Sequence, residues 1–230
     1  MTMTTYLPLY TKAAGASGAP ALASDPSCIL YVPFWKKDGT TFTSDDKYGH
    51  IITNYGTTKD LKGRVFDGVD DFILGPNNPL FNPADAISII VWANQTPLND
   101  NSILVCRYTS DWLTYYHGWR MYASKSGTFD FIFSDGTYPP SFQSSGAVAT
   151  QGIWNMYAVT YDRALVRYYL NGRLVKSNVV TCAINNYNGP LNFGQYNIFS
   201  GSKGEVLEFT RRLSDGEVND YYLATKSRYL

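Results

Sequence analysis

Hydrophobic and polar residues alternate in short runs along most of this 230-residue chain. Alternation with a period of two places apolar side chains on one face of a β-strand. Between the runs stand Gly, Asn, Asp, Pro and Ser, which favour turns. This pattern predicts an all-β chain folded as an antiparallel β-sandwich or barrel. The predicted strands are 29–34, 50–54, 63–66, 70–74, 86–94, 102–107, 118–123, 128–134, 153–161, 165–170, 173–178, 190–194 and 204–210.

Local turn and cap signals sharpen this prediction. Asn171-Gly172 lies between two of the predicted strands, and both residues of a type I′ hairpin turn need positive φ, which favours Asn-Gly. Ser214-Asp215-Gly216-Glu217 has the spacing of a helix capping box, in which the Ser and Glu side chains bond each other's backbone amides. We therefore expect one hairpin at residues 171–172 and one short helix near the C-terminus.

The first 27 residues differ from the rest of the chain. The segment 11–27 is rich in Ala, Gly, Ser and Pro and has no apolar periodicity, which predicts an extended arm at 1–27 before a domain at 28–230. The apolar element of the arm is Tyr6-Leu7-Pro8-Leu9-Tyr10. It is either part of a disordered tail or an assembly element that adds to the sheet edge of a partner or of a neighbouring copy.

Charge and hydropathy exclude several classes of protein. The chain has 19 basic and 19 acidic residues. This balance argues against a nucleic-acid-binding protein and against docking on anionic membranes. No apolar run approaches the roughly 18 residues of a membrane-spanning helix, and the N-terminus lacks the features of a signal peptide. We expect cytoplasmic folding without membrane insertion.

The three cysteines carry no metal-binding pattern. Cys28, Cys106 and Cys182 are far apart, which excludes the spacing of a zinc site. We expect them to be small buried hydrophobic residues. One disulfide with a free thiol is the alternative.

Six sequence blocks resemble a known family. They include Trp154, followed by Ala158-Val159-Thr160-Tyr161-Asp162 and Tyr169-Leu170-Asn171-Gly172. The other blocks are Leu30-Tyr31-Val32-Pro33-Phe34 with 45–50, then 66–73, 87–92, 118–122 and 204–214. Residues 28–224 thereby resemble the laminin G-like domains of the concanavalin A-like lectin/glucanase jelly roll. The resemblance implies a jelly-roll sandwich, a fold that is mostly a binding and scaffolding platform.

Two positions depart from the family pattern. Gly204 stands where the family usually has Asp, and Glu208 stands where it has an apolar residue. Strand alternation places Glu208 on the same face as Val206. A buried carboxylate is costly unless it is paired, so we expect Glu208 to pair with a neighbouring Arg or Lys, the alternative being a partly wet face.

The acidic residues do not form a catalytic pair. Glucanases of this jelly roll use two carboxylates on one strand, spaced i and i+4 or i+5, and retaining chemistry needs them about 5–5.5 Å apart. Glu205 and Glu208 are three apart and so point to opposite faces, and Glu217 belongs to the expected helix. His50 and His117 lie in predicted loops without a nucleophile elbow, where we expect a surface or capping role. The protein is predicted to be non-enzymatic, and a glycoside hydrolase is disfavoured.

An acidic cluster raises the question of calcium. Asp67, Asp70 and Asp71 lie close together, but in this family the same segment is a turn whose carboxylates bond backbone amides. We therefore expect no cofactor. Calcium at these three aspartates is the alternative.

Aromatic loops are the candidate carbohydrate-binding sites. Sugar rings stack on aromatic faces while polar side chains bind their hydroxyls. The candidates are Tyr108, Asp111, Trp112, Tyr115, Tyr116, His117, Tyr138 and Tyr187, the last within Asn185-Asn186-Tyr187-Asn188-Gly189. The alternative is that these aromatics pack the loops or form a protein interface. Trp92, Trp119 and Trp154 are expected in the core.

These observations predict a structural or adhesion protein displayed on the surface of a virus or phage particle, as a decoration, fibre or tail accessory. Its expected partners are other structural proteins, copies of itself, and host glycans. A free lectin-like module is the alternative.

The arm hypothesis makes a direct prediction. Deleting residues 1–20 should leave folding intact, because these residues carry no periodic apolar pattern, and should abolish assembly. Circular dichroism and the oligomeric state by light scattering measure the two effects. Assembly that survives the deletion would contradict the hypothesis.

Overall fold

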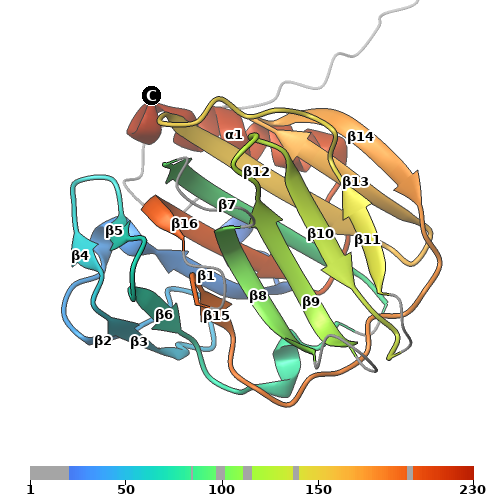
Figure 1. Ribbon diagram of the computed structural model, residues 1–230, viewed down its shortest axis with the longest axis horizontal. Helices are drawn as coiled ribbons and strands as arrows, with labels where there is room; N and C mark the ends of the chain where they lie inside the picture. The colour runs from blue at the N-terminus through green and yellow to red at the C-terminus, as the bar shows by residue number, and fades with distance from the viewer. Residues whose placement is uncertain (1–20, 84, 97–101, 111–115, 137–139, 196–198) are drawn as a thin grey trace, which may run out of the picture.

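The computed structural model describes residues 21–83, 85–96, 102–110, 116–136, 140–195 and 199–230, and it has the predicted antiparallel β-sandwich (Figure 1). Sheet A runs in the order β14 (Arg173–Val179), β13 (Leu165–Leu170), β12 (Trp154–Tyr161), β7 (Ile87–Gln95), β16 (Ser200–Phe209), β5 (Arg64–Asp67) and β4 (Thr58–Lys59), and β1 (Cys28–Pro33) also pairs with β16. Sheet B runs in the order β11 (Ser141–Ser144), β10 (Phe129–Phe133), β9 (Tyr116–Ala123), β8 (Ser102–Ser110), β15 (Asn192–Phe193), β6 (Phe72–Leu74), β3 (Ile51–Tyr55) and β2 (Thr41–Thr43).

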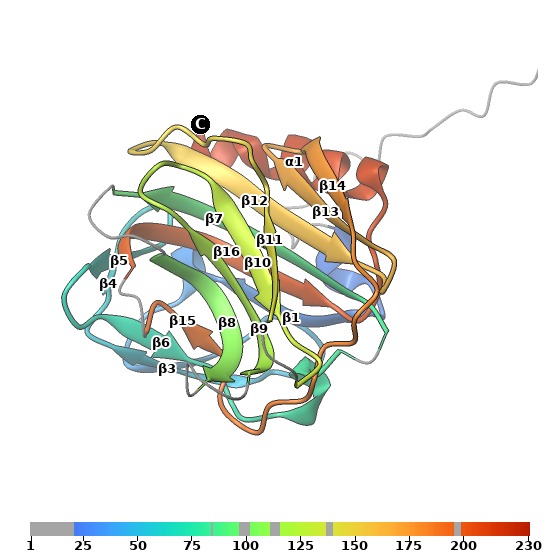
Figure 2. The same ribbon diagram turned by 45° about the vertical axis from the view of Figure 1, so that its right-hand side comes forward.

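The central strands of sheet A are buried on both faces. One face packs on sheet B, and the other is covered by helix α1 (Asp215–Tyr229), which lies beside β12 and β14 (Figure 2). All eight residues of β12 are therefore buried. Tyr157 and Val159 enter the core between the sheets, whereas Met156 and Ala158 enter the core under the helix. The predicted core positions Trp92, Trp119 and Trp154 are confirmed.

Helix α1 begins at the predicted capping box and is longer than expected. Ser214 Oγ accepts from the amide of Glu217, and the Glu217 carboxylate accepts from the amide of Ser214. The helix then continues for 15 residues, and its buried face carries Val218, Tyr221, Thr225 and Tyr229. This spacing of three to four residues puts one side of the helix on the sheet.

A buried carboxylate holds the last turn of α1 to sheet A. Glu205 Oε2 accepts from Arg228 Nη1 at 3.1 Å, and also from Tyr31 Oη and Trp35 Nε1. Glu205 is fully buried, so desolvation raises its pKa while the Arg228 cation opposes the rise. Nearby, Trp92 Nε1 donates to Thr225 Oγ1 at 2.9 Å. These directional polar contacts define the position of the helix on the sheet, which non-directional apolar packing alone would specify less well.

The ion pair predicted for Glu208 is wrong. Glu208 faces the core between the sheets as expected, but no cationic nitrogen of the described residues lies within 4.0 Å of its carboxylate, and its Oε2 atom has no hydrogen-bond partner there. Burial raises the pKa of Glu208 well above its usual range. The cost of the buried charge is avoided by protonation instead of by pairing.

Most predicted strands are confirmed, but three are additional. Thr41–Thr43, Thr58–Lys59 and Ser141–Ser144 form β2, β4 and β11. The hairpin at Asn171-Gly172 is confirmed, with φ of 51° and 79°.

His50 lies in the loop before β3, as predicted, but not at the surface, and the loop position predicted for His117 is wrong. His50 is buried, and its Nε2 atom lies 2.9 Å from the carbonyl oxygen of Ile29. His117 is a half-buried residue of strand β9.

Residues 21–27, at the end of the predicted arm, pack on the domain. A 3₁₀ turn, η1 (Ala21–Ser24), buries Ala23 in the core under α1, and the Asp25 carboxylate bonds Arg211 at 2.6 Å. The tract Tyr6-Leu7-Pro8-Leu9-Tyr10 lies outside the described residues. Cys28 and Cys106 are buried free thiols as predicted, and Cys182 is free and half-buried. Among the described residues no helix has the length and apolar character needed to cross a membrane.

The contact between Glu205 and α1 yields a stability prediction. Arg228→Met should lower the free energy of unfolding by about 3 kcal/mol, because it leaves a buried acid without its cation. Adding Glu205→Gln should recover part of this loss. Lys226→Met is the control in the same helix, since Lys226 contacts only the Tyr222 ring, at 5.7 Å, among the side-chain interactions of the described chain. Urea unfolding measures all four proteins, and equal midpoints for Arg228→Met and wild type would contradict the prediction.

Candidate functional site

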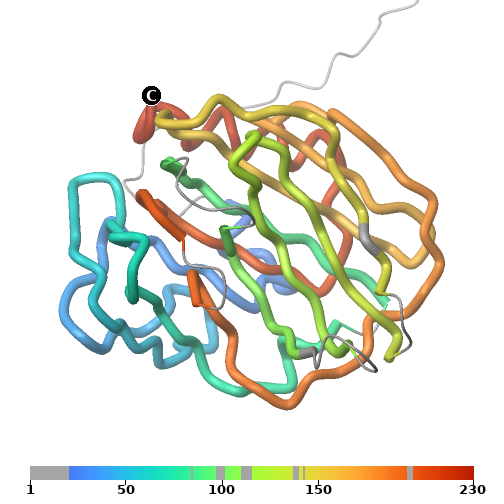
Figure 3. Tube along the Cα trace, in the orientation of Figure 1, coloured from blue at the N-terminus to red at the C-terminus, as the bar shows by residue number. Residues whose placement is uncertain are grey.

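A pocket of about 230 Å³ opens at one end of the sandwich. There the segment that precedes β15 passes the turn η3 (Pro79–Phe81) along the lower edge of the molecule (Figure 3). The residues that line the pocket are Asn77, Pro79, Asn82, Arg107, Asn186, Tyr187 and Asn188. The pocket thus combines four side-chain amides, one guanidinium and one aromatic ring.

The first wall of the pocket is the turn η3 with its flanking residues, and local sequence signals explain its position. Asn78 caps η3, because its Oδ1 atom accepts from the amide of Leu80 at 3.0 Å. Pro79 occupies the first turn, where its missing N–H costs nothing and its fixed φ suits a helix. Asn77 and Asn82 flank this short turn, so both side chains are placed at its ends.

The second wall is a loop held by backbone contacts. The amide of Gly118 donates to the Asn185 carbonyl at 2.9 Å, and the amide of Asn185 donates to the Ser134 carbonyl at 2.6 Å. Gly118 has a φ of 80°, and a Cβ there would fall 1.9 Å from the carbonyl oxygen of Arg107. Only glycine therefore allows this close approach, which brings Tyr187 against Gly118 and Arg107.

Arg107 joins the two walls. Its guanidinium donates from Nε to Asn82 Oδ1 at 3.0 Å, and from Nη2 to Asn77 Oδ1 at 3.1 Å and to the Tyr187 carbonyl at 2.6 Å. Arg107 comes from a core-facing position of β8 and is only 1% exposed. Burial lowers its pKa, yet an arginine stays protonated in proteins. A permanent cation therefore lies in the wall of the pocket.

The chemistry of the pocket suits a polyhydroxylated ligand. Side-chain amides both donate and accept, which matches the hydroxyl groups of a sugar. Asn186 and Asn188 are exposed at the pocket, Tyr187 is half-buried, and no acidic residue is among the lining residues. The lining residues can therefore bind a polyhydroxylated ligand, and none of them has a carboxylate that could serve as general acid or nucleophile.

The predicted carbohydrate-binding residues are distributed unevenly around the pocket. Tyr187 lines it, and His117 Nδ1 lies 2.8 Å from Asn185 Nδ2 in the adjoining loop. Tyr108 and Tyr116 are instead buried with ring centroids 5.9 Å apart, and Arg120 lies over the Tyr108 ring. Asp111, Trp112, Tyr115 and Tyr138 lie outside the described residues.

Sequence reasoning missed Pro79 and three polar residues of the pocket. Asn77 and Asn82 look like ordinary turn residues, and Arg107 lies within a predicted strand. The signal for Arg107 was available, because strand alternation places it on the same inward face as Val105. A cation at such a position needs oxygen acceptors, and here the acceptors are residues that line the pocket.

The glutamates do not face one another. Glu205 points toward α1 and Glu208 toward sheet B, and Glu217 is bonded to Arg211 and the helix cap. Two carboxylates facing one cleft, which glycoside hydrolysis needs, are not formed by these three residues.

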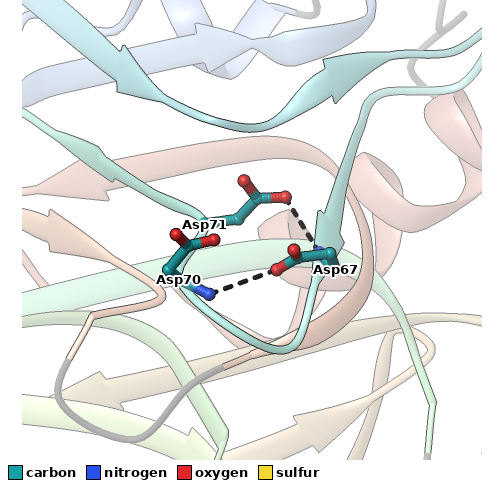
Figure 4. Close-up of side chains that lie close together, drawn as sticks. All are labelled: Asp67, Asp70 and Asp71. Atoms are coloured by element: carbon teal, nitrogen blue, oxygen red, sulfur yellow. Dashed lines mark hydrogen bonds between the residues drawn. The ribbon is translucent and has the colours of Figure 1, made fainter.

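The calcium candidates form a turn (Figure 4). Carboxylate oxygens of Asp67, Asp70 and Asp71 lie within 4.8 Å of one another. However, Asp67 Oδ1 accepts from the amides of Val69 and Asp70, which lowers the pKa of Asp67. Asp71 Oδ2 accepts from the amide of Asp67, and a Cβ at Gly56 would fall 1.8 Å from Asp71 Oδ1. Asp67 Oδ1 and Asp71 Oδ2 are thus engaged with backbone amides of the turn, so the cluster fits a hydrogen-bonded turn better than a calcium site with six to eight oxygens.

Comparison with protein families identifies the class to which this sandwich belongs. A laminin G family model, described as the concanavalin A-like lectin/glucanases superfamily, matches residues 67–219. Because this match covers more than half of the chain, the chain belongs to this family, and the resemblance noted from the sequence is confirmed. A search of the curated proteins found no match.

Solved structures share the fold at low sequence identity. A botulinum neurotoxin type C structure, whose title states that cell entry depends on two ganglioside molecules, is 12% identical with a TM-score of 0.67. A binding domain of botulinum neurotoxin DC in complex with rat synaptotagmin II is 13% identical with a TM-score of 0.66. Each match covers 86% of this chain and 51% of the other, so the chain spans about half the length of these structures.

The turn geometry predicts no response to calcium. A ligand that binds only the folded state raises the thermal unfolding midpoint. Because we expect no calcium to bind, millimolar calcium or a chelator should leave this midpoint unchanged. Differential scanning fluorimetry measures the midpoint, with magnesium as the control ion. A higher midpoint in the presence of calcium, abolished by Asp70→Asn, would contradict the prediction.

Proposed function

We propose that this protein is a non-enzymatic adhesion module that binds glycans in the pocket between η3 and the 185–188 loop. The observation that carries the proposal is the convergence of four amides, Arg107 and Tyr187 on one concave site of a member of the concanavalin A-like lectin/glucanases superfamily. Such a mixture of amides and an aromatic ring suits a sugar, whose faces are apolar and whose edges are hydroxyl groups.

The structural neighbours support binding over catalysis. One title states that cell entry depends on two ganglioside molecules, and two others describe binding domains in complex with SialylT and with rat synaptotagmin II. Identities of 12–13% carry over the fold but not the ligand, so the proposal for this chain depends on its own pocket. The positions of Glu205, Glu208 and Glu217 agree with a non-enzymatic function.

Display on a virus or phage particle remains part of the proposal. Turn η1 packs beside α1 on the face of sheet A that lies away from sheet B, whereas Arg107 of the pocket belongs to sheet B. Attachment through the residues before 21 would therefore leave the pocket facing outward. Self-association through these residues is the corresponding hypothesis for the arm.

Glycan binding has a direct test. Wild-type protein on a glycan array should bind a defined group of glycans, and Asn188→Ala should weaken the hits about tenfold, because it removes one amide of the site. Asn219→Ala on helix α1 is the matched control and should bind as wild type does. Surface plasmon resonance with the best hit measures the affinities.

Two results would contradict the proposal. One is an array without hits for the folded wild-type protein. The other is a set of hits that Asn188→Ala leaves unchanged, since the glycans would then bind elsewhere.

A further inference from the structure

The guanidinium of Arg107 is an uncompensated cation. Its three hydrogen-bond acceptors are neutral oxygens, namely two side-chain amides and one backbone carbonyl. No carboxylate of the described residues lies within 4.0 Å of it, and its Nη1 atom has no hydrogen-bond partner there. Buried arginines are ordinarily paired with an acid, because burying a lone charge is expensive.

The acid that interacts most directly with this cation does not neutralise it. Glu208 lies in the same space between the sheets and interacts electrostatically with Arg107. Burial nevertheless raises the pKa of Glu208 well above its usual range. Burial therefore favours the neutral form of Glu208, whereas an arginine keeps its charge, so positive charge predominates in this wall of the pocket.

We propose that the pocket selects glycans that bear an anionic group, a carboxylate or a sulfate, on the sugar that enters it. This inference rests on the proposed glycan-binding function and names the class of ligand. An anion in the pocket would supply the negative charge that the protein does not place beside Arg107. Guanidinium groups suit both kinds of anion, because their planar donors match paired oxygens.

The surroundings of the pocket favour this selectivity. Every lining residue other than Arg107 is uncharged, so nothing in the lining repels an anion. The pocket walls are protein and not bulk water, which strengthens the attraction between charges. The guanidinium acts through its field over several ångströms, and the proposal does not require that the anion touch Nη1.

The test compares three matched oligosaccharides with one backbone, one neutral, one carrying a carboxylated sugar and one carrying a sulfated sugar. Isothermal titration calorimetry with the full chain should give at least about tenfold tighter binding for an anionic oligosaccharide than for the neutral one. The comparison of the carboxylated and sulfated oligosaccharides identifies which anion is preferred. Raising the salt concentration should reduce the difference in affinity between the anionic and the neutral oligosaccharides, because salt screens charge.

Variants isolate the contribution of charge. Removing Arg107 can disrupt the fold, so the informative change is Asn186→Asp, at an exposed lining residue. The added negative charge should weaken binding of the anionic oligosaccharide about tenfold more than binding of the neutral one, because only the anionic one is repelled. Asn219→Asp makes the same change on α1 and should alter neither.

The outcomes separate the two proposals. Equal affinity for neutral and anionic oligosaccharides, or unchanged anion binding by Asn186→Asp, overturns the inference while glycan binding stands. Failure of all three oligosaccharides together with a silent array overturns both. Anion preference that Asn186→Asp removes and Asn219→Asp retains supports the inference.

Discussion

The architecture depends on the burial of sheet A on both of its faces. Strands β7, β12 and β16 at its centre lie between sheet B and helix α1, so their side chains enter one of two cores. Burial on both sides explains why β12 is uniformly buried instead of having one wet face. It also means that each polar group on these strands needs a partner or must lose its charge.

The buried ionisable residues meet that requirement in different ways. Glu205 accepts three hydrogen bonds and is paired with Arg228, which joins helix to sheet. Glu208, three residues later and on the opposite face, has no such partner and is held neutral by burial. Arg107 cannot lose its proton, and its need for oxygen acceptors draws the asparagines of η3 and the 185–188 loop together. The pocket is thus a consequence of how a core-facing arginine is accommodated.

Features that depend on a few adjacent residues could be predicted from the sequence. The Asn171-Gly172 turn and the Ser214 capping box follow from the conformations of a few adjacent residues, and both are present. Strand β4 was missed because two residues carry no periodicity, and it exists because β5 pairs with it. Glu208 was assigned an ion pair because the sequence cannot show how far each nearby cation ends from a buried group. The pocket was found only in part, since Asn77 and Arg107 come from segments whose meeting depends on the packed sandwich.

The pairing of the first and last strands also governs how the chain can fold. β1 and β16 are neighbours in sheet A, and the bond between Tyr31 and Glu205 joins residues 174 positions apart. Closing so long a loop has a large entropic cost before any contact compensates for it, and such topologies fold slowly. On the ribosome, β1 has no partner in sheet A until β16 has left the exit tunnel. The strand therefore stays unpaired for most of synthesis, when its exposed apolar residues are open to chaperones.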